Sequence, residues 1–397
     1  MSHCETDSDI ENNTTKPIKF GVGKYKNIMG VTCYMNSILH ILQHVPIFME
    51  WITQAKFRDV LIRKIEHKII KQSLPNTYET REKLTKEFVI FELFRLFNIS
   101  MANDDSSMTP TSFKKLIGTK NDMWNEHNHQ DSQEFFTFIV SQLGEEAGVK
   151  TEFIPGLNYS DSQTELTFVE SIYNITATNS WIKFQSREYS PLTNIFNGLI
   201  ETTKRCLCCQ SSVTTYEPYI TLGLSIPIKN RSDILKSFTI YDCLNHLIKE
   251  EQLDAENRMS CEMCGLKNQG HTQSLFWRTP KVLVLHIKRF LVNPFGIPTQ
   301  KLNNEVHYPI KDLDLSKYFN PASPFKSNSK YDLIGINLHE SYGFGGNINH
   351  GHYTSMIKNI INNNWYLYND GQPVITIQNA QQLQNPNVYL LFYYCQN

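Results

Sequence analysis

Cys33 is the residue of this sequence whose surroundings best suit a nucleophile. It lies in the segment GVTCYMNS (residues 30–37), and the apolar residues that follow recur at helical spacing, which places Cys33 at a helix N-terminus. Free N–H groups and the helix dipole favour an anion there, so a thiolate at Cys33 would be nucleophilic near neutral pH. Its own N–H group could also serve an oxyanion hole. The alternative is a small buried cysteine that packs at a helix start and does no chemistry.

A thiolate nucleophile needs an imidazole to hold the proton and a third group to orient that ring. His352 precedes one expected strand, and Asn369 and Asp370 directly follow another, so these side chains could complete such a set. The chain has thirteen histidines, and any one of them is more often a surface or packed residue than a base. His350 would point to the same strand face and is the obvious competitor of His352.

Four of the nine cysteines form two pairs with metal-ligand spacing. They are Cys206 and Cys209, and Cys261 and Cys264, with residues 210–260 between the pairs. In a reducing compartment this pattern favours zinc over disulfides, and four thiolates make a closed tetrahedral site that is structural. Cys208 could compete, but the spacing favours its neighbours. The alternative is four unliganded thiols left by loss of the metal.

The elements that must position these residues change character along the chain. Helical periodicity marks residues 33–44, 57–71, 83–97 and 130–143, and Pro46 is expected to stop the first of these helices. Short β-rich runs follow at 281–290, 331–339, 353–358, 365–368 and 388–395. Strands joined by short turns imply a largely antiparallel sheet, and segregated helices imply an α+β fold.

Composition excludes several classes of function. Hydrophobic residues make up 40% of the 397 residues, aromatic residues 12% and charged residues 19%, which is a globular profile. The formal charge of −1, without long runs of one sign, predicts no direct nucleic-acid binding. No apolar stretch is long enough to span a membrane, and the polar first residues do not resemble a signal peptide. We therefore expect an intracellular protein, cytoplasmic or nuclear, with a flexible tail over residues 1–19.

Several segments resemble the motifs of one family in the family's order. Residues 30–37 resemble the Cys box of the ubiquitin-specific proteases, and residues 351–353 with 365–370 resemble their His box. Residues 130–135, 283–290, 301–309 and 331–339 resemble further motifs of that family. The resemblance covers nearly everything after Lys24, and weak motifs in the correct order make a chance match improbable.

The resemblance implies a papain-like cysteine protease core over residues 20–397, with a thumb at about 20–145, fingers at about 195–280 and a palm formed by the remainder. Cys33 would lie on the thumb and His352 on the palm, with Asn369 as the third catalytic residue. The implied reaction is hydrolysis of the bond after ubiquitin's C-terminal glycine, through a thioester. The implied partners are ubiquitin and ubiquitinated proteins, with one structural zinc per chain at the fingertips. The alternatives are a ubiquitin-binding pseudoenzyme and a papain-like peptidase for general substrates.

Asp131 and Glu134 allow two interpretations. Three residues apart at a helix start, they suit an N-cap and an N3 carboxylate. In the family that the chain resembles, carboxylates on the thumb pair with the arginines of the ubiquitin tail, which would make both residues ubiquitin-binding. The two roles are compatible.

The sequence departs from the family pattern just before the nucleophile. Relatives place an asparagine five residues before the cysteine, where its amide donates to the oxyanion, whereas here that position is Ile28 and the asparagine is Asn27. Either the loop shifts so that Asn27 reaches the hole, or the hole relies on the Cys33 N–H and one other group. We expect the second arrangement, and hence a slow enzyme that gains turnover in Ile28→Asn and changes little in Asn27→Ala.

Overall fold

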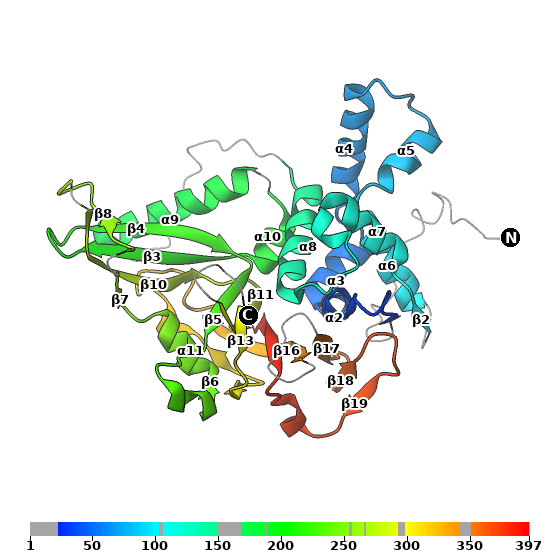
Figure 1. Cartoon of the computed structure of the whole chain (residues 1–397). Coiled ribbons are helices and arrows are strands. Elements are labelled where there is room, and N and C mark those ends of the chain that lie inside the picture. Colours follow the sequence, from blue (N-terminus) through cyan, green and yellow to red (C-terminus); the bar gives the residue numbers. More distant parts are fainter. Residues whose placement is uncertain are drawn as a thin grey trace.

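The computed structural model describes residues 23–102, 106–149, 168–187, 189–253, 256–265, 267–292, 298–341 and 351–396 (Figure 1). The predicted tail (1–19) and His350 lie outside these ranges. Most of the helices precede the large sheets in chain order: α2 (Cys33–Leu42), α3 (Pro46–Thr53), α4 (Arg58–Lys71), α5 (Tyr78–Thr85), α6 (Val89–Ala102), α7 (Thr111–Lys120), α8 (Ser132–Ala147), α9 (Phe168–Arg187) and α10 (Pro191–Phe196). No helix among the described residues is long and apolar enough to cross a membrane.

Two larger sheets make up the rest of the molecule. The first has the strand order β4 (Ser212–Tyr219), β3 (Gly198–Cys206), β10 (Gly270–Arg278) and β7 (Glu251–Gln252). The second has the order β19 (Ile375–Ile377), β18 (Trp365–Tyr368), β17 (Gly351–Lys358), β16 (Lys330–Ser341), β20 (Val388–Cys395), β11 (Val282–Lys288) and β5 (Thr221–Ser225), with β15 (Leu313–Asp314) beside β16. In the second sheet β5 and β11 are parallel and the other pairs are antiparallel, so the predicted α+β class is confirmed.

The second, eight-stranded sheet is covered on both faces. Successive apolar side chains of its central strands point to opposite faces and enter two different cores. Leu390 and Phe392 of β20 belong to the core that the sheet shares with α2 and α8, whereas Leu391 and Tyr393 belong to a second core on the opposite face. Side chains two residues apart share a face of a strand, so one strand serves two cores. The second core includes Ile240 of α11 (Ile240–Leu247). The nucleophile helix α2 is therefore packed directly on the sheet that carries His352.

Two predicted helix boundaries were wrong. Pro46 does not simply stop the first helix but opens α3 as its first residue, a position where the missing N–H costs nothing. The predicted helix 83–97 is divided into α5 and α6. The buried carboxylate of Glu146 accepts from the N–H groups of Val89 and Ile90 at 3.0 and 2.8 Å, and so caps α6 at that point.

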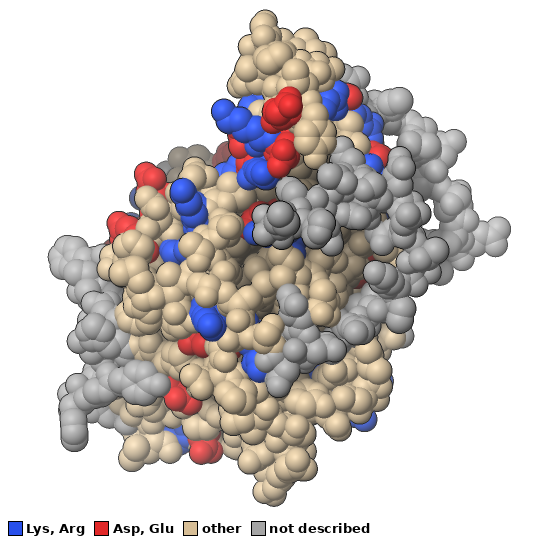
Figure 2. Space-filling model, turned by 90° about the vertical axis from the view of Figure 1, so that its right-hand side faces the viewer, with Lys and Arg blue, Asp and Glu red and all other residues tan. Residues whose placement is uncertain are grey.

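The four-stranded sheet extends to the left in Figure 1, away from α2 to α8. Helix α9 packs against it through Trp181, which joins Trp277 of β10 and Tyr216 of β4 in a small separate core. On the opposite side, α4 and α5 form a projection where blue and red side chains are interspersed (Figure 2). Ion pairs within this region include Lys68 with Glu87 and Arg81 with Glu66.

Four two-stranded sheets complete the described strands: β1 (Lys24–Tyr25) with β2 (Ser107–Met108), β12 (Phe290–Val292) with β13 (Pro298–Lys301), β14 (Val306–His307) with β6 (Phe238–Thr239), and β8 (Met259–Ser260) with β9 (Lys267–Asn268). The β1–β2 pair matters for the site, because it places the chain entering α2 beside the start of α7. The β8–β9 pair flanks the second cysteine pair.

Candidate active site

Cys33 is the first residue of α2 and is buried. The chain enters the helix through a tight turn in which Met29 and Gly30 have φ values of 53° and 77°. The N–H of Ile28 donates to the Thr32 hydroxyl at 2.8 Å, and the Ile28 carbonyl accepts from Val31 at 3.1 Å. No described residue accepts from the N–H of Cys33. That N–H is therefore free to face an incoming carbonyl oxygen.

His352 and Asn369 come from neighbouring strands of the large sheet. His352 lies on β17 and Asn369 follows the last residue of β18, and the His352 Nε2 atom is 2.7 Å from the Asn369 Oδ1 atom. His352 is also hydrogen-bonded to Cys33. Because Nε2 faces Asn369, Nδ1 is the nitrogen available to the thiol. The structure thus brings together the three side chains that the sequence suggested, in the order nucleophile, imidazole, orienting amide.

The hydrogen bond with Cys33 is the main reason why the pKa of His352 is raised, from its usual 6.5 to about 9. Burial acts in the opposite direction, while Asn369 and the charges of Cys33 and Asp370 add to the rise. An imidazolium that persists through neutral pH can hold a thiolate beside it as an ion pair. The arrangement therefore keeps a protonated imidazole beside Cys33 at neutral pH.

Asp370 joins the nucleophile helix to the strand that carries the orienting amide. Its Oδ2 atom accepts from the Asn27 amide at 3.0 Å and lies 3.8 Å from His352 Nε2, and its Oδ1 atom accepts from the Asn36 amide at 2.8 Å. Burial raises the pKa of this carboxyl, and the two amides oppose that rise. Asn36 was not singled out from the sequence. The sequence feature that could have identified Asn36 is its position three residues after Cys33, on the same helix face.

The side chain of Asn27 reaches the start of α2. Its Oδ1 atom accepts from the N–H of Thr32 at 2.8 Å, and its Nδ2 group donates to Asp370. Met29 takes a left-handed conformation in the turn between Asn27 and α2. These contacts tie Asn27 to the helix start and to Asp370, and its part in an oxyanion hole stays a prediction. The side chain of Ile28 has no donor, and only its backbone is used in the turn.

Asp131 is the N-cap of α8, and its carboxylate accepts from the N–H groups of Gln133 and Glu134 at 2.6 and 3.2 Å. Its second oxygen accepts from the Tyr389 hydroxyl of β20. The pKa of Glu134 is raised, first by desolvation and then by the neighbouring charge of Asp131. The capping interpretation of Asp131 therefore holds in the structure, and Glu134 carries a second negative charge one helical turn away.

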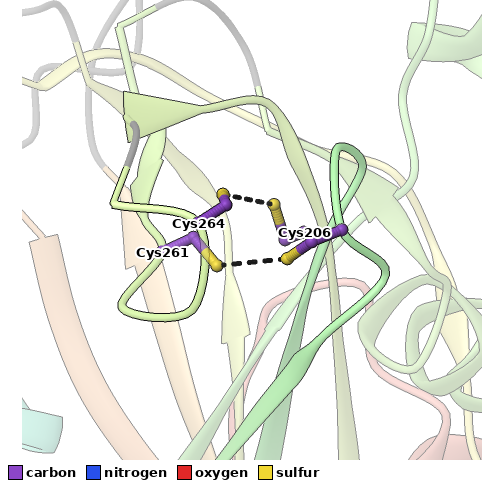
Figure 3. A group of neighbouring side chains, drawn as sticks. Cys206, Cys261 and Cys264 are labelled. Carbon is purple, nitrogen blue, oxygen red and sulfur yellow. Dashed lines mark hydrogen bonds between the residues drawn. The ribbon is translucent and has the colours of Figure 1, made fainter.

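The four paired cysteines converge where the loop between β3 and β4 meets the loop between β8 and β9; Figure 3 labels Cys206, Cys261 and Cys264. Their sulfur atoms all lie within 4.8 Å of one another, with 3.9 Å between Cys206 and Cys264 and 3.5 Å between Cys209 and Cys261. Tetrahedral zinc with bonds of about 2.3 Å separates its sulfur ligands by about 3.8 Å. The four side chains therefore fit a metal ion of this kind. Cys208 is exposed and is not part of the cluster.

Comparison with known proteins agrees with this architecture. A family model described as "Ubiquitin carboxyl-terminal hydrolase" matches residues 25–393. Ubiquitin carboxyl-terminal hydrolase 2 of the rat is 28% identical over 94% of this chain and 54% of its own length, and the chicken protein of that name is 30% identical over 79% of this chain and 80% of its own length. The chain thus spans only about half the length of the rat relative.

Solved structures share the fold. The SAGA Ubp8/Sgf11/Sus1/Sgf73 DUB module bound to ubiquitin aldehyde contains a chain that matches with a TM-score of 0.60 and 24% identity, over 94% of this chain and 69% of that one. A structure of the yeast SAGA DUB module with a mutant Sgf73 matches with a TM-score of 0.61 and 24% identity, over 94% of this chain and 68% of that one. The expected fold is therefore confirmed. By sequence and by fold, this chain belongs to the ubiquitin carboxyl-terminal hydrolase family.

Proposed function

We propose that the protein is a deubiquitinase that hydrolyses the bond after the C-terminal glycine of ubiquitin in its conjugates. The observation that carries the proposal is the contact of His352 with both Cys33 and Asn369 across two segments of the fold. Family membership makes ubiquitin the expected substrate. The curated rat relative that bears the hydrolase name is longer than this chain, so the activity of this chain has to be tested on its own.

In the proposed reaction the Cys33 sulfur attacks the carbonyl carbon of the terminal glycine and forms a C–S bond, while the carbonyl oxygen becomes an oxyanion. His352 then gives its proton to the leaving amine as the C–N bond breaks, which leaves a thioester. Water attacks the thioester, His352 takes the proton, and the C–S bond breaks to regenerate Cys33. Asn369 keeps the imidazole in the plane and tautomer that both transfers need.

Two donors at the start of α2 can stabilise the oxyanion. One is the backbone N–H of Cys33, at the positive end of the helix dipole. The other is the amide of Asn27, which has two N–H groups and donates only one of them to Asp370. The Asp370 carboxylate fixes the amide, so its second N–H can be aimed before substrate binds. This proposal replaces the slow enzyme expected from Ile28.

Recognition of the ubiquitin tail is assigned to the carboxylates of Asp131 and Glu134. The tail is rich in arginine, and guanidinium groups pair well with carboxylates. Support comes from the raised pKa of Glu134, which burial causes first and the charge of Asp131 second, because a half-buried carboxylate beside another one is stabilised when a cation arrives. The hydroxyl of Tyr389 holds one oxygen of Asp131 in place.

One zinc ion per chain is proposed for the cluster of Cys206, Cys209, Cys261 and Cys264. The four thiolates would leave no position for water, so the metal would supply folding free energy and no catalytic step. By joining the loop that carries Cys206 and Cys209 to the loop that carries Cys261 and Cys264, the metal would stabilise the tip of the four-stranded sheet. The catalytic residues lie on other elements.

Turnover of ubiquitin-amidomethylcoumarin tests the proposal. Cys33→Ala should abolish hydrolysis and labelling by a ubiquitin probe with a C-terminal electrophile, while ubiquitin binding is retained. Cys208→Ser is the matched control, because it removes an exposed thiol outside both the proposed active site and the metal cluster. Hydrolysis by Cys33→Ala at the parent rate would overturn the assignment. A parent protein that binds ubiquitin but never hydrolyses it would support the pseudoenzyme alternative.

A further inference from the structure

His40 lies one helical turn deeper in α2 than Asn36, on the face that also carries Cys33. Its side chain is fully buried. The imidazole lies between two aromatic rings, with its centroid 4.9 Å from that of Tyr25 and 4.8 Å from that of Tyr368. Tyr368 immediately precedes Asn369, so a contact with its ring is a contact with the turn that carries the orienting amide.

A second histidine fixes the other end of Tyr368. The His44 Nε2 atom lies 3.2 Å from the Tyr368 hydroxyl, and the His44 Nδ1 atom lies 2.7 Å from the carbonyl oxygen of His40. Tyr368 is thus held at its ring face and at its hydroxyl by two residues near one end of α2. The Asp370 carboxylate is tied to the same helix by Asn36.

The groups around the imidazole keep it neutral. Burial, followed by the proximity of His44, lowers the pKa of His40 to about 3, and burial lowers the pKa of His44 to about 4. Backbone groups of Asp370 and Gly23 face the ring and oppose the shift. Tyr25 and Tyr368 stay un-ionised because burial raises the pKa of each phenol.

A flat ring at this place contacts both tyrosines at once. The His40 ring is fully buried, and the groups that face it are the backbone of Asp370 and Gly23 together with the two phenol rings. The flat ring does separate Tyr25 from Tyr368 at distances that suit aromatic contacts. The spacing between α2 and β18 is set at this point.

We propose that His40 is a positioning residue, whose ring between Tyr25 and Tyr368 sets the place of the Asn369–Asp370 turn relative to Cys33. The inference rests on the proposed roles of Cys33, His352 and Asn369. Without the ring, Tyr368 moves toward α2 and carries Asn369 away from the imidazole of His352. The expected cost falls on the chemical step, because His40 lies in the interior, away from any bound substrate.

The test compares His40→Ala with Ile41→Ala. Both side chains are buried in α2, and Ile41 packs against Gly335 of β16. Two readouts are needed. The first is the rate at which iodoacetamide alkylates Cys33, followed by mass spectrometry as a function of pH. The second is kcat and KM for ubiquitin-amidomethylcoumarin, with melting temperatures measured for each variant.

Both variants should melt earlier, but only His40→Ala should slow Cys33 alkylation at neutral pH, because a displaced Asn369 no longer holds the imidazolium of His352 beside the thiol. It should also lower kcat at least about tenfold with little change in KM. His40→Phe, which keeps a flat ring, should restore the alkylation rate. Should His40→Ala not fold, His40→Leu keeps the volume without the ring and takes its place.

The inference is overturned if His40→Ala and Ile41→Ala give the same alkylation profile and the same kcat. It is also overturned if His40→Phe leaves the alkylation slow. Alkylation needs no ubiquitin, so the two proposals fail separately. A parent protein with the expected alkylation profile but no ubiquitin turnover refutes the proposed function alone.

Discussion

Asn27→Ala is the change that tests most directly how the entry to the nucleophile helix works. The substitution removes the acceptor of the Thr32 N–H and the donor to Asp370. A neutral hydrogen bond contributes about 1 kcal/mol to stability and one to a charged group about 2 kcal/mol, so the free energy of unfolding should fall by about 3 kcal/mol. If the second amide N–H also faces the oxyanion, transition-state stabilisation falls by a further ~3 kcal/mol, about a hundredfold in kcat.

Two companion variants separate these effects. Asn27→Asp keeps the acceptor for Thr32 but places a carboxylate beside Asp370, where two like charges about 3 Å apart cannot both ionise. Its turnover should therefore depend on pH more steeply than that of the parent. Ile28→Ala is the matched control, because Ile28 contributes only backbone groups to the turn. Ile28→Asn should leave kcat near the parent value if Asn27 supplies the donor, as proposed.

The assay is ubiquitin-amidomethylcoumarin turnover between about pH 6 and 8.5, within which an ordinary imidazole titrates, with thermal melting of each variant. A loss of kcat much larger than the control's, together with a lower melting temperature, is the expected result for Asn27→Ala. Turnover and melting temperature both equal to those of Ile28→Ala would refute the reasoning. A lower melting temperature with unchanged kcat would limit Asn27 to a structural role.

Three further predictions follow from the described contacts. The His352 imidazolium, whose pKa is raised to about 9, should contribute its full stabilisation of the fold below about pH 6.5 and lose it as the pH rises through about 9, and Asn369→Ala should move that upper limit down, measured by NMR titration of the imidazole; an unchanged limit would remove Asn369 from the set. Glu134→Lys should weaken ubiquitin turnover with little change in melting temperature, whereas Asp131→Ala should also cost about 1 kcal/mol of stability through the lost cap; full turnover in both variants would leave only the cap. Purified protein should contain one zinc per chain by elemental analysis, and Cys206→Ser or Cys264→Ser should lower the melting temperature far more than Cys208→Ser; a folded, active, metal-free protein would contradict this.

Much of the fold, and the residues that make up the candidate site, could be predicted from local sequence patterns. Cys33 sits in a short segment whose helical continuation is periodic, and the strands at 365–368 and 388–395 have the predicted bounds. Each of these signals lies within a dozen residues of sequence. The family motifs then related the segments to one another, which spacing alone could not have done.

The features that sequence reasoning missed depend on contacts between distant segments. The start of α6 is fixed by Glu146, which lies on α8, so no local pattern near Val89 could indicate it. The reach of Asn27 depends on a left-handed Met29, and a single sequence does not reveal which residue of a loop will accept that conformation. The role of Asn36 becomes visible only when Asp370 is placed beside it.

The place of β20 has a consequence for how activity is acquired during synthesis. This strand is the last in chain order, yet it lies between β16 and β11 in the middle of the large sheet. Strands β17 and β18, which position His352 and Asn369, join the rest of the sheet only through β16. A nascent chain that has made Cys33 and its helix therefore still lacks the strand that unites the two halves of the sheet. Assembly of the proposed active site should come late, only after residues 388–395 have left the ribosome.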